Sequence, residues 1–315
     1  MPLTRRSVLL ASLTGLAALA GCGGGYSGPP RTLSIAAGEE GGFYLAFARL
    51  LAGRITAAEP RLTCTALTTK ASQANLEMVV TGKADLALVL ADTAQTAMAG
   101  RSPFTTPLPV RALGRVYENY MQLVVRANGP IRGIADLTGR AVSLGASGSG
   151  AALFGDRLIR TAGVHPRVER LPLAEAVAQL TDGRIEALLW SGGVPTPALA
   201  ELDSKVGILL LSLDVVAPRL RAEYGPVYET VTVPSGAYQH VRDVRTIGVA
   251  NLLVCSPTLP DDVAGAVVSV LVRQAAELVP QQALGTQFLD SRTLIATAGV
   301  PLHPGAAETY RDLHG

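Results

Sequence analysis

The sequence has few charged and few aromatic residues. Of its 315 residues, 17% are charged and 4% are aromatic, and the 27 Lys and Arg are nearly balanced by 25 Asp and Glu. With a net charge of +2 and no basic stripe, no nucleic-acid partner is expected. Because 48% of the residues are hydrophobic, the composition excludes a disordered chain and indicates a compact globular protein.

Residues that hold metals or carry catalysis are also scarce. The four histidines are not spaced for a metal site with one another, and no pair of cysteines completes one (His165, His240, His303 and His314). A Ser-His-Asp triad can draw on distant residues, so the parts alone do not exclude it, but no motif places a histidine beside a candidate serine. We therefore expect no catalytic activity, no metal and no cofactor.

Cysteine is limited to three positions, Cys22, Cys64 and Cys255. Cys64 and Cys255 each lie in an apolar, strand-like run. In an exported protein the two could form a disulfide, and the alternative is a pair of buried free thiols. The sequence favours free thiols, because nothing in it brings the two Cα atoms within bridging distance.

The amino terminus has the layout of an export signal. Arg5 and Arg6 precede an apolar run over residues 8–20, which is shorter than the roughly 20 residues that span a bilayer. Small residues follow at the expected cleavage site, so residues 1–21 are predicted to be a signal peptide. The paired arginines are similar to a twin-arginine signal, although Val8 stands where Phe is usual, and the export route stays open.

The segment Leu19-Ala20-Gly21-Cys22 resembles the bacterial lipobox. The resemblance implies that Cys22 is acylated and anchors the mature chain to the outer face of the cell membrane. The alternative is a plain cleaved signal with a chance cysteine. Residues 22–31 are rich in Gly, Ser and Pro and are predicted to be a flexible tether.

The remainder of the chain alternates strand and helix patterns. It is longer than one hydrophobic core usually supports, which predicts two lobes. Strands are expected over 32–37, 61–67, 85–90, 110–117, 121–126, 141–144, 168–171, 187–190, 208–213 and 246–254. Helices are expected over 43–56, 72–81, 92–99, 151–162, 174–181, 196–202 and 261–278, with a partly helical tail. This order is typical of parallel α/β units, whose ligands bind at the carboxyl ends of the strands.

The strongest candidate site is the turn at residues 143–150, between a predicted strand and helix. Its small residues let backbone N–H groups approach an anion, and Ser147 and Ser149 add hydroxyl donors beside Gly148 and Gly150. The alternative is a tight connection that binds nothing.

Four further turns also follow predicted strands. In the turn at 38–44, Gly42 precedes Phe43, which could stack on a ligand, and Tyr44, which offers a hydroxyl. Glu39 and Glu40 could meet an ammonium group, although adjacent acids in a loop are more often solvated. The remaining candidates are Ser72 and Asn75, Asp92 as either a ligand contact or a helix cap, Trp190 as either core or a lid, and Gly193.

These motifs together resemble the TAXI family, the solute-binding subunits of TRAP-type transporters. The matching segments are Gly-Gly-Phe-Tyr at 41–44, Ser72 to Leu76, residues 82–87, residues 145–150, residues 193–197 and residues 251–254. The resemblance implies an α/β, two-lobed type II periplasmic-binding-protein architecture (a Venus flytrap) with two crossover hinges. Residues 32–120 and 246–315 would form lobe 1, and residues 121–245 lobe 2.

The resemblance further implies a receptor that captures a small carboxylate or a glutamate-like amino acid and delivers it to a TRAP-type permease. Such a protein is expected to act as a monomer. A sensor kinase is an alternative membrane partner, and an exported hydrolase on the same fold would need a histidine near a cleft serine. Three positions depart from the family pattern, Leu45, Leu90 and Lys70-Ala71, so the ligand could differ from glutamate.

Overall fold

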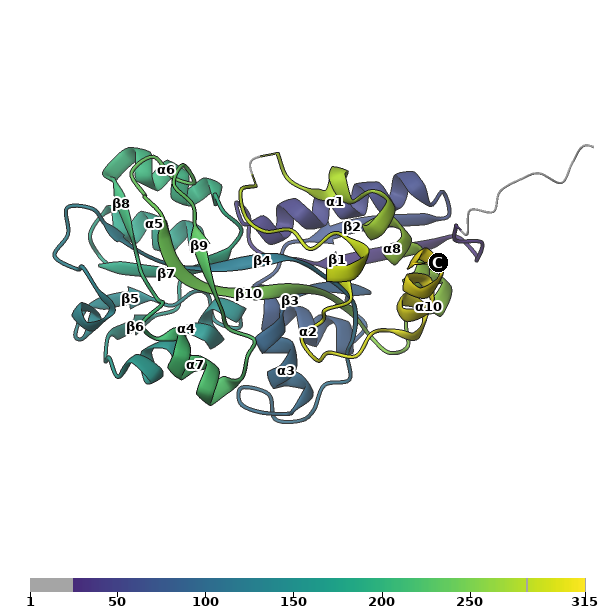
Figure 1. Ribbon diagram of the computed structural model, residues 1–315, viewed down its shortest axis with the longest axis horizontal. Helices are drawn as coiled ribbons and strands as arrows, with labels where there is room; N and C mark the ends of the chain where they lie inside the picture. Colours follow the sequence, from purple (N-terminus) through teal and green to yellow (C-terminus); the bar gives the residue numbers. More distant parts are fainter. Residues whose placement is uncertain (1–24, 282, 315) are drawn as a thin grey trace, which may run out of the picture.

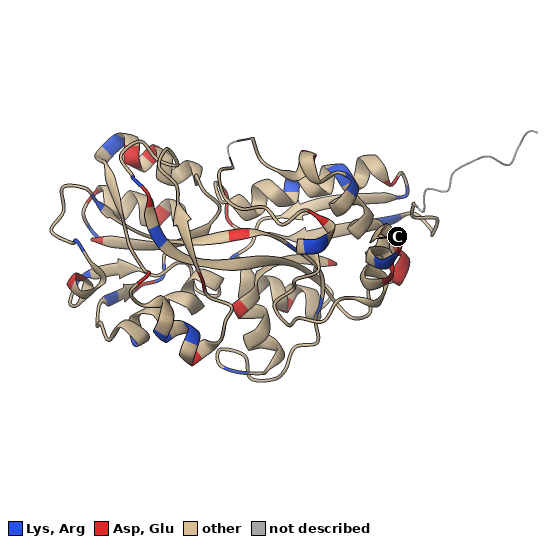
Figure 2. Ribbon diagram, in the orientation of Figure 1, with Lys and Arg blue, Asp and Glu red and all other residues tan. Residues whose placement is uncertain are grey.

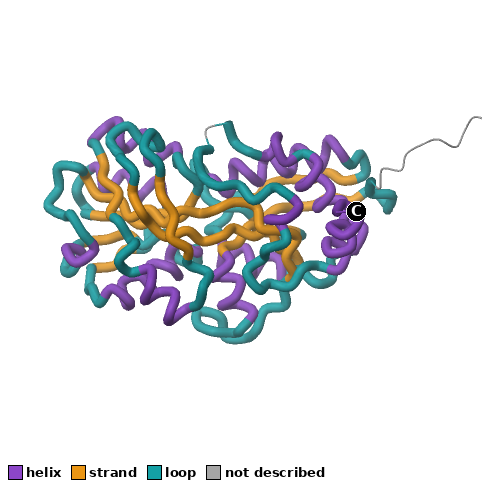
Figure 3. The backbone as a smooth tube through the Cα atoms, in the orientation of Figure 1, coloured by secondary structure: helices purple, strands orange, loops and turns teal. Residues whose placement is uncertain are grey.

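The computed structural model describes residues 25–281 and 283–314. Strands run through the middle of an elongated molecule, and helices lie on both sides of the sheet (Figures 1 and 3). The predicted signal peptide and Cys22 lie outside the described residues. None of the described helices combines the length and the apolar character that crossing a membrane requires.

The described strands are β1 (Arg31–Ala36), β2 (Leu62–Leu67), β3 (Leu86–Leu90), β4 (Arg111–Arg126), β5 (Ala141–Ser143), β6 (Arg167–Glu169), β7 (Ala187–Gly192), β8 (Ile208–Leu211), β9 (Glu229–Val233) and β10 (Val244–Cys255). The described α-helices are α1 (Phe43–Ala58), α2 (Ser72–Val80), α3 (Ala91–Met98), α4 (Gly150–Ala162), α5 (Leu173–Thr181), α6 (Pro197–Val206), α7 (Ala217–Tyr224), α8 (Asp261–Arg273), α9 (Ser291–Leu294) and α10 (Pro304–His314). Two short 3-10 helices are η1 (Ile134–Leu137) and η2 (Ala275–Leu278).

One sheet joins these strands in the order β2-β1-β3-β10-β4-β7-β5-β6, with β8 beside β4 and β9 beside β10. In one half, β1 pairs in parallel with β2 and β3. In the other half, β5 pairs in parallel with β6 and β7. Every residue of β3 is buried, as expected for an inner strand that is covered on both faces and pairs in parallel with β1 and antiparallel with β10. Within each half the parallel strands end at the same edge, and the strand-to-helix turns of the two halves meet at the junction between them.

The two halves are joined by β4 and β10, which run antiparallel to each other. Residues 111–120 of β4 pair with β10, whereas residues 120–125 pair with β7. In β10, residues 248–255 pair with β4, whereas residues 244–248 pair with β9. Both strands therefore change partners at the same level, which is marked by the pair Tyr120 and Gly248.

The fold class expected from the sequence is confirmed, and several element boundaries were wrong. The two strands expected at 110–117 and 121–126 are one continuous strand, β4, because Glu118 and Asn119 are buried and continue the ladder with β10. Helix α7 and strand β9 were not predicted. The long helix expected at 261–278 ends at Arg273, where a 3-10 turn follows.

Lys and Arg residues are interspersed with Asp and Glu residues along the ribbon in both halves of the molecule (Figure 2). Glu118 of β4 is only 2% exposed. Arg115 lies 3.1 Å from Glu118 Oε2 and 3.6 Å from Glu229 on β9. Burial raises the pKa of Glu118 from 4.5 to about 7, although Arg115 opposes the shift. A Cβ atom at Gly248 would stand 2.5 Å from Glu118 Oε1, so the partner exchange in β10 needs glycine to leave this carboxyl room.

The raised pKa of Glu118 predicts a pH-dependent stability. Between the ordinary value of 4.5 and about 7, folded Glu118 holds a proton that the unfolded chain has released. The contribution of Glu118 to the free energy of unfolding is therefore complete below pH 4.5 and is lost as the pH rises through 7. The loss is up to about 1.4 kcal/mol per pH unit and about 3 kcal/mol in all. Urea unfolding of the wild type and of Glu118→Gln between pH 4.5 and 7.5 measures it. A difference between the two proteins that does not change with pH would contradict the prediction.

Candidate functional site

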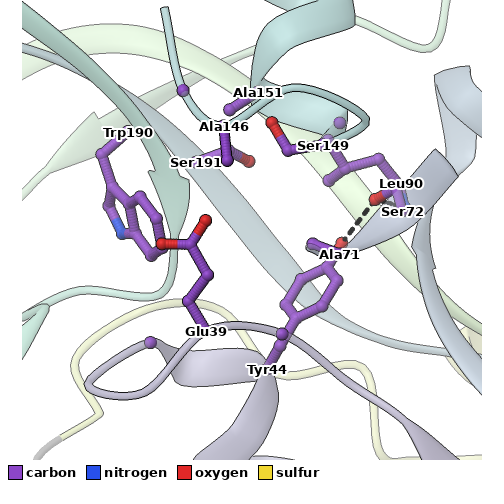
Figure 4. A pocket seen from close by; sticks show the side chains of 14 residues that line it. Glu39, Tyr44, Ala71, Ser72, Leu90, Ala146, Ser149, Ala151, Trp190 and Ser191 are labelled. Atoms are coloured by element: carbon purple, nitrogen blue, oxygen red, sulfur yellow. Dashed lines mark hydrogen bonds between the residues drawn. The ribbon is translucent and has the colours of Figure 1, made fainter. Parts of the chain in front are cut away.

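A small, partly open cavity of about 30 Å³ lies where the turns of the two halves meet. It has room for roughly two water molecules. Five chain segments form its walls: the turn after β1 into α1, the start of α2, the end of β3, the turn from β5 into α4, and the end of β7. The lining residues are Gly38, Glu39, Gly42, Tyr44, Ala71, Ser72, Leu90, Gly145, Ala146, Ser149, Gly150, Ala151, Trp190 and Ser191 (Figure 4).

Hydroxyl groups from α1 and α2 form one wall of the cavity. The hydroxyls of Tyr44 and Ser72 lie 3.3 Å apart, and Ser72 Oγ accepts the N–H of Leu90 at 3.1 Å (Figure 4). Asn119 donates from Nδ2 to the Tyr44 hydroxyl at 3.1 Å. Burial raises the pKa of Tyr44, so the phenol stays protonated and this wall is neutral.

The opposite wall is the turn from β5 into α4. Gly145 and Gly148 have φ values of +90° and +82°, which glycine adopts without the steric cost other residues meet. Ser149 caps the helix by accepting the N–H of Ala152 at 3.0 Å. Among the described residues, the N–H groups of Gly150 and Ala151 donate to no protein acceptor, and both residues line the cavity. Together with the helix dipole, these free donors make the wall attractive to an anion.

Glu39 projects its carboxylate into the cavity from the turn after β1 (Figure 4). Oε2 accepts the N–H of Leu173, the first residue of α5, at 2.6 Å. Burial raises the pKa of Glu39, and this hydrogen bond opposes the shift. No Lys, Arg or His of the described chain lies within ion-pair distance of it.

Trp190 covers the cavity from β7. Its indole Nε1 donates to Thr196 Oγ1 at 3.0 Å, which fixes the ring. A Cβ atom at Gly42 would lie 3.3 Å from this ring, so glycine allows the α1 turn to pack closely beneath it. Trp190 therefore packs beside the α1 turn and forms part of the cavity wall.

The structure brings six of the twelve predicted ligand-binding residues to the cavity wall: Gly42, Tyr44, Ser72, Ser149, Gly150 and Trp190. Phe43 packs instead on Tyr117, with ring centroids 4.7 Å apart, and Gly193 lies against Phe43. Asn75 is fully buried, and its amide donates to the carbonyls of Ala37 and Leu88 at 2.6 and 2.8 Å. Asn75 therefore lies in the interior of its half and not in the cavity wall.

The other predicted residues of the β5–α4 turn lie outside the lining. Ser147 is exposed. The carbonyl of Gly148 accepts the N–H groups of Gln73 and Ala74 at 3.2 and 3.3 Å. Gln73 also donates from Nε2 to the carbonyl of Ser149 at 2.9 Å. The turn is therefore held against the start of α2 by hydrogen bonds that cross between the halves.

Asp92 belongs to a buried polar network behind the cavity. It is 1% exposed, lies 3.4 Å from Arg157 of α4, and accepts the Tyr228 hydroxyl at 2.8 Å. Arg157 donates to Tyr228 at 2.7 Å and to Thr96 at 2.6 Å. Burial raises the pKa of Asp92, and Arg157 opposes that shift. Since Asp92 and Thr96 lie on α3, the network ties α3 to α4 across the junction.

Sequence reasoning did not select the other lining residues. Glu39 was weighed as a ligand contact and set aside, because an adjacent pair of acids is usually solvated. Its position at a predicted strand-to-helix turn was the one available signal. The lining residues that received no role from the sequence are Gly38, Ala71, Leu90, Gly145, Ala146, Ala151 and Ser191.

Among the described residues, the cavity has neither a cluster of metal ligands nor a histidine beside its serines. No cluster of three or more His, Cys, Asp or Glu residues among those described could hold a metal ion. The described lining contains no histidine or cysteine. Cys64 and Cys255 are buried free thiols, and burial raises the pKa of each to about 12.

A family model described as the NMT1-like family matches residues 35–313. Among solved structures, the chain is similar to a protein from Bordetella bronchiseptica RB50, with 15% identity, a TM-score of 0.58, and coverage of 90% of this chain and 98% of that one. It is similar to the alkanesulfonate-binding protein SsuA from Xanthomonas axonopodis pv. citri bound to MOPS (17% identity, TM-score 0.50, 90% and 85% covered). A mutant of ArgBP from T. maritima matches with 12% identity, a TM-score of 0.50, and 78% and 91% covered. The fold is that of periplasmic solute-binding proteins.

Removing Arg157 should destabilise the protein strongly. Arg157→Met leaves Asp92 buried without its cationic partner, which typically costs about 3–5 kcal/mol. Asp92→Asn combined with Arg157→Met should recover much of that loss, because the buried charge is then gone as well. Urea unfolding measures both variants. The control is Arg160→Met on the same helix, which is exposed and should change stability by less than about 0.5 kcal/mol. A loss in Arg157→Met no larger than in this control would refute the role of the network.

Proposed function

The chain belongs to the NMT1-like family and has the fold of periplasmic solute-binding proteins, and from this premise we propose that it is a lipid-anchored, extracytoplasmic solute receptor. It captures a small carboxylate or amino acid between its two lobes and delivers it to a membrane transporter of the TRAP type, as its resemblance to TAXI subunits suggests. The observation that carries the proposal is the cavity between the strand-to-helix turns of the two halves, with free backbone donors of α4 on one wall.

The lobes of this receptor are residues 32–120 with 246–315, and residues 121–245. The exchange of partners at Tyr120 on β4 and at Gly248 on β10 supports hinges at these two points. Rotation about them would separate the β5–α4 turn from the start of α2 and open the cavity. Since the closed cavity holds only about 30 Å³, a solute of amino-acid size needs the walls to move apart before it can enter.

Solute capture predicts stabilisation by ligand. A thermal-shift screen of the purified exported protein against amino acids, dicarboxylates and keto acids should give a clear rise in melting temperature with one class. At 100 times the dissociation constant, the gain is about 2.7 kcal/mol. A screen without any stabilising solute, in protein freed of co-purified ligand, would count against the proposal.

Two variants sharpen this screen. A Cβ atom at position 150 would lie 2.5 Å from Leu90 Cδ1 and 2.7 Å from Ser72 Oγ, so Gly150→Ala should hold the walls apart and abolish the shift. Ser147→Ala is the control, because Ser147 is exposed and outside the lining. Its shift should equal that of the wild type.

The membrane anchor gives a separate prediction. Acylated Cys22 should place the protein in the membrane fraction, and Cys22→Ser should release it into the soluble exported fraction, because acyl chains supply the anchoring energy. Mass spectrometry of the mature amino terminus and cell fractionation measure this. Gly24→Ser is the matched control and should remain membrane-bound. Equal distribution of wild type and Cys22→Ser would show that no lipid holds the chain.

A further inference from the structure

The cavity contains a single charged side chain. Among the described residues that line it, Glu39 alone carries a charge. Arg49 pairs with Glu40 on the surface at 2.8 Å, and Lys70 is exposed and absent from the lining. One end of the cavity is therefore negative and has no protein cation to balance it.

Glu39 has a free acceptor directed at this space. Oε2 is bound by the N–H of Leu173, but Oε1 accepts no hydrogen bond from any described residue. The carboxylate points toward the region between Trp190 and Ser149 (Figure 4). An unpaired carboxylate oxygen in a closing cavity is a suitable partner for an ammonium group, since charge-assisted hydrogen bonds are the stronger kind.

The opposite wall has the complementary polarity. Gly150 and Ala151 present free N–H groups at the start of α4, a helix of 13 residues. The cavity thus offers an attractive position for one anionic group and an attractive position for one cationic group.

The rest of the polar lining is neutral. It consists of the hydroxyls of Tyr44, Ser72, Ser149 and Ser191, and Ser191 Oγ is buried without a hydrogen-bond partner. A hydroxyl of this kind can satisfy an amide or hydroxyl on the solute. A second carboxylate, in contrast, would be desolvated beside Glu39 with no cation to pair with.

We propose that the solute is a zwitterionic amino acid with an uncharged side chain, and that Glu39 is the residue that selects it. This rests on the proposed function and narrows it. The ammonium group binds Glu39, the single carboxylate binds the N–H groups of Gly150 and Ala151, and a neutral side chain meets the hydroxyl wall. Glutamate and dicarboxylates are discriminated against, because each brings one carboxylate more than the cavity can pair.

Isothermal titration of the purified exported protein with matched solutes tests this selection. The comparison of L-alanine with L-lactate tests whether the ammonium group of the solute is required. L-asparagine against L-aspartate and L-glutamine against L-glutamate test the second carboxylate at nearly constant shape, and succinate tests both. The neutral amino acid of each pair should bind at least about tenfold more tightly than its partner.

Glu39→Gln identifies the residue responsible. This change keeps the shape and an oxygen acceptor for the Leu173 N–H but removes the charge. Affinity for the neutral amino acids should fall between about 10- and 150-fold, and their advantage over lactate, aspartate and glutamate should shrink. Glu40→Gln is the control, because Glu40 is exposed and pairs with Arg49, and its affinities should match the wild type.

The outcomes separate this inference from the receptor proposal. Tight wild-type binding of succinate or glutamate that is unchanged in Glu39→Gln would overturn the inference while leaving a solute receptor. An equal loss in Glu40→Gln would overturn the assignment to Glu39. Failure of every solute class to bind would overturn both.

Discussion

The whole structure depends on two strands that belong to both halves. Because β4 and β10 each change partners at the level of Tyr120 and Gly248, they hold the two halves together, and in the proposed hinge motion each half turns relative to the other about that level. The ladder beside this level also contains buried polar atoms without protein partners, at the Tyr117 hydroxyl, Asn119 Oδ1 and both amide atoms of Asn251. Such atoms typically cost about 1–3 kcal/mol each when they stay unpaired. These unpaired atoms therefore add nothing to the strand pair, whose backbone register also shifts between Asn251 and Leu252 and between Leu253 and Val254.

Two groups of contacts between the halves act differently. The Asp92–Arg157–Tyr228 network is buried. Separating its members is costly, because each buried charge would lose its partner. The bonds from Gln73 and Ala74 to the β5–α4 turn are backbone and amide contacts that water can replace at little cost. A hinge motion that releases the second group while preserving the first would open the cavity and keep α3 against α4.

The parts of this molecule that could be predicted from its sequence are those set by local pattern. The strands and helices from residue 31 to residue 99 were predicted to within a few residues, and the turns at strand ends led to six lining residues. Pairings across long sequence separation could not be predicted. Asp92 finds its partners 65 and 136 residues away, and Glu118 is kept in a continuous strand by β10. Glu39 and Glu40 are neighbours with the same side chain, and only the arrival of Leu173 from the other half distinguishes the one in the cavity.

The hydrogen bond between Leu173 and Glu39 links the charge of a solute to closure of the two halves. Leu173 belongs to the half opposite Glu39, so in the proposed hinge motion its N–H would reach Glu39 as the halves come together, and the accompanying burial would raise the pKa of the carboxyl. An empty cavity closes against that desolvation cost, which one hydrogen bond offsets only in part. A cationic group beside Oε1 of Glu39 lowers the desolvation cost in the closed state. In the open state the same group interacts weakly with Glu39, because water already solvates the carboxylate. A ligand shifts a conformational equilibrium only by its difference in affinity for the two states. Glu39 has no protein cation beside it, so a solute with a cationic group would favour closure, whereas a solute without one would not.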